Sequence, residues 1–201
     1  MVPPAAPGDD RPDTRHRILD VADRLFRHYG YDKTTVADIA RELSMSSANV
    51  YRFFGSKLEI VEAIARAMFA ERHRINLEIL ASEGAPSERL HRLLVENHRQ
   101  SVLTLTCDRK VHDMVEIAMA QQWPAIEAHL AQFADVIEEL IHQGVAAGEF
   151  AVADTRRAAV CARQSFVSMI HPTLIVHCSD DRERAGPEEL ADFVVGALRR
   201  R

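Results

Sequence analysis

Apolar residues recur along this chain three or four positions apart, as on one face of a helix, and no stretch alternates as a strand would. The first such stripe consists of Ile18, Ala22, Leu25, Phe26 and Tyr29. It predicts a helix over residues 14–29, which Gly30 would cap at its C-terminus. A second, shorter stripe predicts a helix from Val36 to about Leu43.

Polar residues mark where the next helices begin. Thr35 followed three residues later by Asp38 is a capping box, in which a hydroxyl and a carboxylate each accept a backbone N–H. Ser46 can cap a third helix, whose first residues are small and polar. We therefore expect two short helices separated by a tight turn at residues 44–47.

A much longer helix follows, opened by a second capping box at Ser56 and Glu59 after Gly55. The remaining breaks fall at Gly, Pro and charged clusters. They predict helices near Lys57–Ala81, Ser87–Leu105, Lys110–Ala120, Trp123–Ala147, Asp154–Cys178 and Pro187–Arg200. The predicted fold class is all-α, with about nine helices.

The two short helices and their turn match the arrangement of a helix-turn-helix, whose second helix lies in the DNA major groove. The second helix is too short and too polar to be buried in a core, and a role in contacting DNA explains it best. Val50 and one of Phe53 or Phe54 would face inward, while Ser47, Asn49 and Arg52 would project toward base edges or backbone. The sequence therefore predicts a DNA-binding unit.

The same segment carries the pattern T-V-x-x-I-A, a turn, and Y-x-x-F-x-S-K, at Thr35, Val36, Ile39, Ala40, Tyr51, Phe54, Ser56 and Lys57. In this it resembles the tetracycline-repressor (TetR) family of bacterial transcription regulators, from Thr14 to about Ile64. Two positions depart from the family's usual residues: Ser44 stands in place of Gly in the turn, and Phe53 in place of His. The second departure removes a phosphate contact, which Arg52 could replace.

The resemblance implies a ligand-responsive, dimeric regulator of transcription that acts as a repressor. It also implies that Tyr51 and Lys57 contact phosphates, while Thr35 can offer its capped helix end to another. With the outward-facing residues of the second short helix, the predicted DNA-binding set is Thr35, Ser46, Ser47, Asn49, Tyr51, Arg52 and Lys57.

The formal net charge of −5 is unevenly divided along the chain. Residues 11–57 hold 9 Lys/Arg and 6 Asp/Glu, giving +3, while the rest holds 16 and 24, giving −8. Phosphate would attract the first part and repel the second, which helps to orient the protein on DNA. The charge pattern therefore agrees with the helix-turn-helix.

Composition suggests three regions. Residues 1–12 hold four of the eight prolines and no apolar period, so we expect a disordered arm. Residues 13–57 would form the DNA-binding domain, and residues 58–201 a helical ligand-binding and dimerisation domain. With no membrane-spanning run or signal peptide, the protein is expected in the cytoplasm. Without CxxC spacing, Cys107, Cys161 and Cys178 are expected as free, buried thiols.

Apolar residues in the second half either form a core or line a cavity, and on pattern alone a core is the commoner outcome. The TetR resemblance implies an inducer site in this half, which favours a cavity for a mostly apolar or aromatic molecule. The predicted ligand contacts are Asn97, His98, Met114, Trp123, Phe133, Gln164 and Phe166, with Ile126 and Met169 among the other candidate wall residues.

The last two predicted helices are the expected dimer interface, because in the resembling family they pair into a four-helix bundle. The stripes that would meet there are Val160, Gln164, Val167 and His171 on one helix, and Leu190, Phe193, Val194 and Ala197 on the other. The expected partners are therefore operator DNA, a small-molecule effector and a second copy of this chain.

Ten histidines leave one alternative open, a helical metal-dependent sensor or a di-iron-type enzyme. Glu88/His91 and Glu139/His142 have the E-x-x-H spacing of di-iron bundles, but both glutamates would point away from the apolar stripe. A single-metal site would have to use His98, His112, or His171 and His177 with Cys178. No nucleotide loop, nucleophile motif or H-E-x-x-H occurs, so no catalytic residue, cofactor or metal ligand is predicted.

Overall fold

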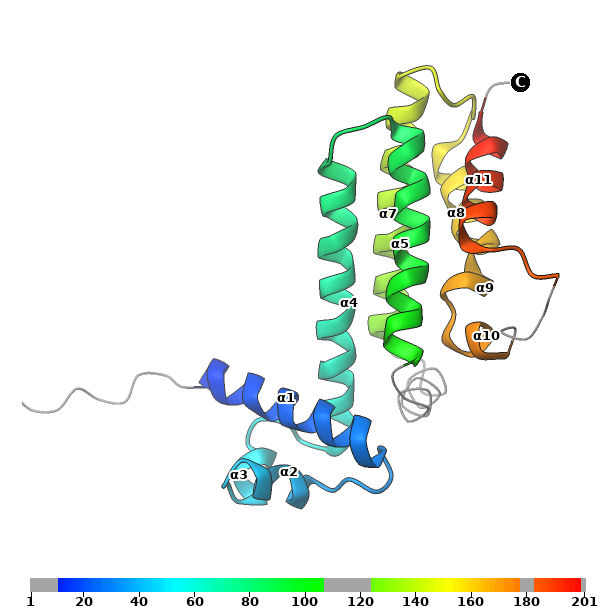
Figure 1. The fold of residues 1–201 in the computed structure, drawn as a ribbon. Helices are drawn as coiled ribbons and strands as arrows, with labels where there is room; N and C mark the ends of the chain where they lie inside the picture. Colours follow the sequence, from blue (N-terminus) through cyan, green and yellow to red (C-terminus); the bar gives the residue numbers. More distant parts are fainter. Residues whose placement is uncertain (1–10, 107–123, 178–182, 200–201) are drawn as a thin grey trace, which may run out of the picture. The chain divides into compact units, whose positions relative to one another are not determined.

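The computed structural model describes residues 11–106, 124–177 and 183–199. Within these ranges the chain forms ten helices and no strand, apart from an isolated bridge between Phe150 and Arg199 (Figure 1). The predicted all-α fold is confirmed. The chain divides into two compact units between Arg66 and Ala67, inside a long helix. None of the described helices is both long and apolar enough to cross a membrane.

The first unit is built from three helices and the start of a fourth: α1 (Arg11–Tyr29), α2 (Val36–Glu42), α3 (Ser47–Tyr51) and α4 (Lys57–Ala81). Its core consists of Ile18, Ala22, Leu25, Phe26, Val36, Ile39, Ala40, Val50, Phe54, Ile60, Val61 and Ala63. The helix predicted over residues 14–29 begins earlier than expected, so residues 11 and 12 belong to α1 and not to a disordered arm. The rest of that predicted arm lies outside the described residues.

Local hydrogen bonds explain where these helices begin and end. Gly30 has a φ of 91°, and its N–H donates to the Phe26 carbonyl at 2.9 Å, which closes α1 as predicted. The Asp38 N–H donates to Thr35 Oγ1 at 3.2 Å, and the Thr35 N–H donates to Asp38 Oδ2 at 2.9 Å. This reciprocal pair is the predicted capping box of α2.

One residue of the predicted α1 stripe is not part of the core. Tyr29 is 54% exposed, although Phe26, three residues before it, is fully buried. Tyr29 is the last residue of α1, where the chain leaves the helix through the left-handed Gly30. The ring therefore lies beyond the core and contacts His28, with ring centroids 4.4 Å apart.

The second unit continues from α4 through α5 (Pro86–Thr106), α7 (Pro124–Ala146), α8 (Thr155–Ser165), α9 (Val167–Ile170), α10 (Pro172–His177) and α11 (Pro187–Leu198). Helix α5 packs against α7 and α11, and α7 packs along α8 (Figure 1). Leucines of α5, the inner face of α7 and the apolar face of α11 form one core. The helix predicted over residues 110–120 lies outside the described residues.

The helix predicted from Asp154 to Cys178 is wrong as a single element, because it is divided into α8, α9 and α10. Phe166 leaves helical geometry at φ −89° and ψ 1°. His171 is extended, at φ −78° and ψ 125°, and directly precedes Pro172. A proline disfavours helical geometry in the residue before it and offers no N–H, so the chain must break there.

The prediction of buried thiols fails for Cys161, which is free but exposed on α8. The core side of α8 is occupied by Ala159 and Ala162. Cys161 lies two positions after Ala159 and one before Ala162, so it is rotated off that side. Cys107 and Cys178 lie outside the described residues.

Candidate functional site

Helix α3 is a short helix with one buried face and one accessible face. Val50 is fully buried, as is Phe54 just beyond the helix, and these two residues hold α3 on the first unit. Tyr51 is 51% exposed, Arg52 is exposed, and Asn49 is half-buried. The helix therefore presents polar and aromatic side chains to solvent, as the sequence predicted.

The start of α3 is fixed by Ser46, whose Oγ accepts the Asn49 N–H at 3.2 Å. Ser46 is exposed and Ser47 is half-buried in the first turn. The turn before it requires an unusual backbone, because Ser44 has a φ of 54°. This is the position where the TetR pattern has glycine, which adopts a left-handed conformation at little cost.

Thr35 and Asp38 form a polar group at the start of α2. Thr35 Oγ1 also donates to Asp38 Oδ2 at 2.6 Å, and Arg41 Nη2 donates to Asp38 Oδ1 at the same distance. The hydrogen bonds from Thr35, followed by that from Arg41, lower the pKa of Asp38. The cap thus leaves Thr35 exposed at the N-terminal end of the helix.

Lys57 holds the first unit together, a role that sequence reasoning missed. Its Nζ donates to the carbonyls of Tyr31 and Thr34 at 2.8 and 3.0 Å, and it lies 3.9 Å from the centroid of the Tyr31 ring. Both carbonyls belong to the loop between α1 and α2. Since an ammonium has three donors, the described contacts leave one for another acceptor.

A second long-range contact ties the end of α3 to α1. Arg15 Nη1 donates to the Phe53 carbonyl at 3.0 Å, and its guanidinium carbon lies 4.1 Å from the centroid of the Phe54 ring. The structure therefore fixes Arg15 against the unit itself. Arg52, in contrast, makes no ion pair within the described ranges.

The second unit contains a cavity of about 170 Å³. Its apolar lining comes from Met68, Phe69, Ile126, Leu130, Val167 and Ile170. Its polar lining comes from Arg72, Asn97, Ser101, Thr104, His129, Arg163 and His171. Although seven of these residues are polar, most of the surface that they and the others expose to the cavity is apolar, and an apolar surface with converging polar groups is typical of a small-molecule site.

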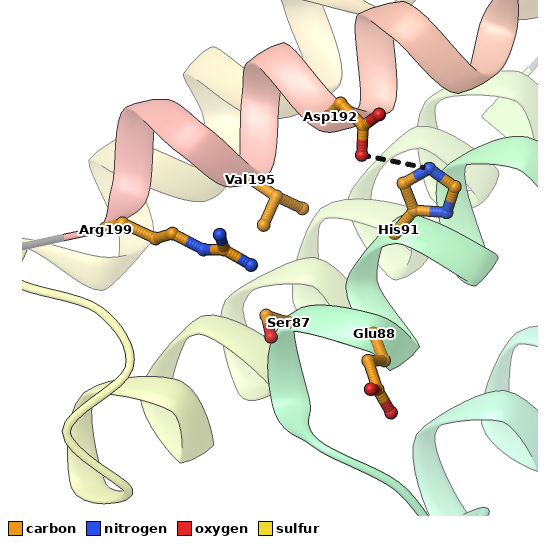
Figure 2. Close-up of a pocket in the computed structure, with 6 residues that line it drawn as sticks. All are labelled: Ser87, Glu88, His91, Asp192, Val195 and Arg199. Carbon is orange, nitrogen blue, oxygen red and sulfur yellow. Dashed lines mark ion pairs between the residues drawn. The ribbon is translucent and has the colours of Figure 1, made fainter.

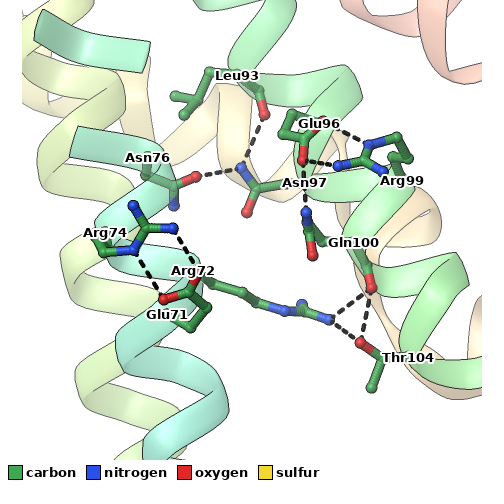
Figure 3. Close-up of polar contacts among 10 residues, drawn as sticks. All are labelled: Glu71, Arg72, Arg74, Asn76, Leu93, Glu96, Asn97, Arg99, Gln100 and Thr104. Atoms are coloured by element: carbon green, nitrogen blue, oxygen red, sulfur yellow. Dashed lines mark hydrogen bonds and ion pairs between the residues drawn. The ribbon is translucent and has the colours of Figure 1, made fainter. Parts of the chain in front are cut away.

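Arg72 crosses from α4 to α5 at one side of this cavity (Figure 3). Its Nη1 donates to Ser101 Oγ at 3.1 Å, and its Nη2 donates to the Gln100 carbonyl at 3.2 Å and to Thr104 Oγ1 at 3.1 Å. All three acceptors are uncharged. Burial lowers the pKa of Arg72 to about 10, so the guanidinium is still protonated at neutral pH.

His129 faces the cavity from α7 and stacks on Phe69 of α4, with centroids 4.5 Å apart and rings 11° from parallel. Burial lowers the pKa of His129 to about 4, helped by the positive charge of Arg72 and by His73. The imidazole is therefore neutral at pH 7 and acts as a flat aromatic wall.

Of the predicted ligand contacts that lie within the described residues, the structure brings only Asn97 to this cavity. Phe133 and Phe166 are fully buried in the core of the second unit, and Gln164 is exposed on α8. His98 Nδ1 donates to the Met169 carbonyl at 2.7 Å, so it links α5 to α9. Met114 and Trp123 lie outside the described residues.

The helical phase explains these differences. Phe133 and Phe166 belong to the core that also contains residues of α5 and α11, so they do not face the cavity. Ile126, which the sequence predicted as a wall residue, does line the cavity. The missed polar residues Ser101 and Thr104 carried a usable signal, because they share a helix face with the predicted Asn97. Asn97, Ser101 and Thr104 are spaced four and three residues apart, which places them on one face of α5.

The E-x-x-H pairs do not converge on a common site. Glu88 and His91 border a shallow groove of about 290 Å³ with Asp192 and Arg199, where His91 Nε2 lies 3.5 Å from Asp192 Oδ1 (Figure 2). Glu88 points away from this pair (Figure 2). Glu139 and His142 are both exposed on α7. Within the described ranges, no three His, Cys, Asp or Glu residues gather as metal ligands.

The geometry defines a class of protein, a helix-turn-helix DNA-binding unit joined to a helical unit with an internal cavity. Comparison with known families agrees. Residues 18–64 match the model described as bacterial regulatory proteins, tetR family, and residues 86–191 match the model described as tetracyclin repressor-like, C-terminal domain. The chain belongs to the TetR family and is a ligand-responsive, DNA-binding transcriptional regulator.

Individual relatives are also similar to this chain over most of its length. The transcriptional regulator TtgR of Pseudomonas putida is 26% identical over 76% of each chain. A TetR/AcrR-family regulator from Thermobifida fusca has a TM-score of 0.67 at 24% identity, covering 92% of this chain and 96% of that one. RolR, solved with resorcinol, has a TM-score of 0.61 at 19% identity, covering 94% and 89%.

Higher identities among curated relatives occur over short stretches. They reach 43% over 47 residues and 32% over 76 residues, where the matches span 20% and 37% of the relatives' lengths.

Proposed function

We propose that this regulator is a repressor that binds operator DNA as a dimer and releases it when a mostly apolar small molecule occupies the cavity of the second unit. The single observation that carries the proposal is the exposed polar face of α3, held by the buried Val50 and Phe54 behind the Ser44 turn. A repressor of bacterial genes would act in the cytoplasm.

The predicted contacts separate into positioning and reading groups on this surface. Asn49 and Ser47, in α3, are proposed to face base edges. Thr35, Ser46, Tyr51 and Arg52 are proposed to bind phosphates, and Lys57 can contribute its remaining donor. Phosphate contacts fix the register of a protein on DNA, whereas base contacts carry the sequence preference.

The dimer is proposed to form through α8 and α11. Phe193 on α11 is 70% exposed, an unusual state for a phenylalanine, and exposed apolar residues of this size mark interaction surfaces. Gln164, Cys161 and Ala197 are also exposed on these helices. The predicted interface must be revised at Val194, which is buried in its own core, and at His171, which lines the cavity, whereas Val167 is 43% exposed and stays in the proposed interface.

Fluorescence anisotropy with labelled DNA from upstream of the protein's own gene tests the proposed DNA contacts. Asn49→Ala should lose about 1–3 kcal/mol of discrimination at one base position. Arg52→Ala should weaken binding to all sequences alike and reduce the slope of log K against log salt by about one.

Arg99→Ala is the matched control. It removes another exposed arginine, which lies in the second unit and pairs with Glu96, and should leave DNA binding unchanged. If Asn49→Ala and Arg52→Ala bind this DNA as wild type does, in affinity, sequence preference and salt dependence, the assignment of α3 is wrong.

A further inference from the structure

Two arginines line the cavity of the second unit, and neither pairs with an acidic residue among those that the structure describes. Among the described residues that line it, none is Asp or Glu. Arg72 and Arg163 form no ion pair within the described ranges, and the buried Arg163 Nε has no hydrogen-bond acceptor there. Arg72 is half-buried among uncharged acceptors and Arg163 is half-buried with one buried donor unsatisfied among the described residues, so an anion that enters the cavity would compensate both positive charges.

Two carboxylates that neighbour lining residues in the sequence, Glu71 beside Arg72 and Glu96 beside Asn97, are engaged elsewhere. On α4, Glu71 accepts from Arg74 at 2.6 and 2.9 Å, and on α5, Glu96 accepts from Arg99 and Gln100 (Figure 3). The described bonds of Arg72 use three of the five donors of a guanidinium. Its remaining donors can therefore serve a bound anion without breaking the link between α4 and α5.

The rest of the cavity suits one flat ring. Its volume of about 170 Å³ is close to the roughly 150 Å³ of an engineered apolar cavity that holds benzene. The stacked Phe69 and His129 offer an aromatic wall, and Met68 offers a sulfur that packs well at a ring edge. Such a cavity has little space for a long acyl chain.

We propose that the effector is a small aromatic monocarboxylate, whose ring packs among the apolar residues of the cavity and whose carboxylate is neutralised by Arg72 and Arg163. The inference rests on the proposed role of this cavity as the effector site, and it adds the charge and size of the effector. Guanidinium groups are well suited to this role because their paired donors match the two carboxylate oxygens.

Calorimetric titration of the full chain without DNA tests the charge of the ligand. The probes are benzoate and phenylacetate, each compared with its neutral amide, benzamide or phenylacetamide. The acid of each pair should bind at least about tenfold more tightly, because hydrogen bonds to charged groups stabilise a complex more than neutral ones. Amides that bind as tightly as their acids, or acids that show no saturable binding, overturn the proposal.

Variants test which arginines are responsible. Arg163→Gln should weaken binding of the acids about tenfold or more and leave the amides unchanged. Arg163 donates no hydrogen bond within the described ranges, so this variant should fold. For Arg72, which links two helices, Arg72→Lys keeps the charge and should retain part of the affinity. Arg156→Gln removes an exposed arginine of α8 and is the matched control.

Acid binding that neither Arg163→Gln nor Arg72→Lys alters would overturn the assignment of the arginines. Binding to upstream DNA, measured in parallel, separates this inference from the proposed function. Acids that bind a protein with no affinity for that DNA refute the repressor and leave the anion site standing. Intact DNA binding, with amides that bind as tightly as acids, refutes the anion site alone.

Discussion

Ser44 has a φ of 54°, in the left-handed region that costs a residue with a side chain about 1–2 kcal/mol. Ser44→Gly relieves this cost but gains freedom in the unfolded chain, which offsets about 0.4–1 kcal/mol. We therefore expect the free energy of unfolding, measured by urea denaturation, to rise by up to about 1.6 kcal/mol. The control Ser47→Gly, inside α3, should lower it by about 0.5–1 kcal/mol. An equal change in the free energy of unfolding from both substitutions would show that the backbone at Ser44 is not strained.

His129 predicts a pH dependence of stability. Its pKa is lowered to about 4 in the folded protein, against about 6.5 when unfolded. Between these values the unfolded state binds the proton and the folded state does not, so stability is present above pH 6.5 and lost as pH falls toward 4. The full loss from this one group is about 3 kcal/mol.

The matched variant is His129→Phe, which keeps a ring beside Phe69 but cannot titrate. From pH 7 to pH 4, the free energy of unfolding of wild type should fall by about 3 kcal/mol more than that of the variant. Parallel curves for the two proteins would show that His129 titrates normally in the folded state.

At the residue scale, local contacts could be predicted and distant ones could not. The caps of Thr35 and Ser46 join residues three apart, so the order of residues alone identifies them. Lys57 instead reaches carbonyls 23 and 26 residues away, and Arg15 reaches one 38 residues away. Such contacts depend on how helices pack, which periodicity does not specify.

At the scale of elements, the sequence predicted the long helix α4 with its observed bounds, Lys57–Ala81, because caps and breaks flank it. It failed between α8 and α10, where Pro172 was included in a single helix. Apolar residues keep a helical spacing on both sides of Pro172, although the backbone cannot continue as a helix through the residue before a proline. That break is why His171 reaches the cavity and cannot share an outward stripe with Val160 and Gln164.

Helix α11 carries the prediction about assembly. An exposed aromatic at the centre of an interface contributes at least about 2 kcal/mol, so Phe193→Asp should raise the dimer dissociation constant about thirtyfold or more. Sedimentation velocity should then show a shift toward monomer at concentrations where wild type is dimeric. Leu77→Asp, at another exposed apolar position, should not change assembly. A Phe193→Asp variant that sediments as wild type does would exclude α11 from the interface.

At the scale of the whole molecule, the two units share one element, α4, which begins with Lys57 in the first unit and carries Arg72 to the cavity in the second. A ligand acts as an inducer only if it binds the DNA-incompetent state more tightly, since equal affinity for both states shifts nothing. The family and the all-α fold could be predicted from the helix-turn-helix pattern. The cavity's arginines could not, because their burial depends on packing between distant helices.

The most direct test of the regulator as a coupled system is the affinity of one ligand measured with and without DNA. A thermal-shift panel of acidic and neutral aromatic molecules would supply the tightest ligand, whatever its charge, and upstream DNA would be the second partner. A coupling of about 1–3 kcal/mol predicts that this ligand weakens DNA binding roughly 5- to 150-fold, and that DNA weakens ligand binding by the same factor. A ligand dissociation constant that is identical with and without bound DNA would show that ligand binding and DNA binding are not coupled.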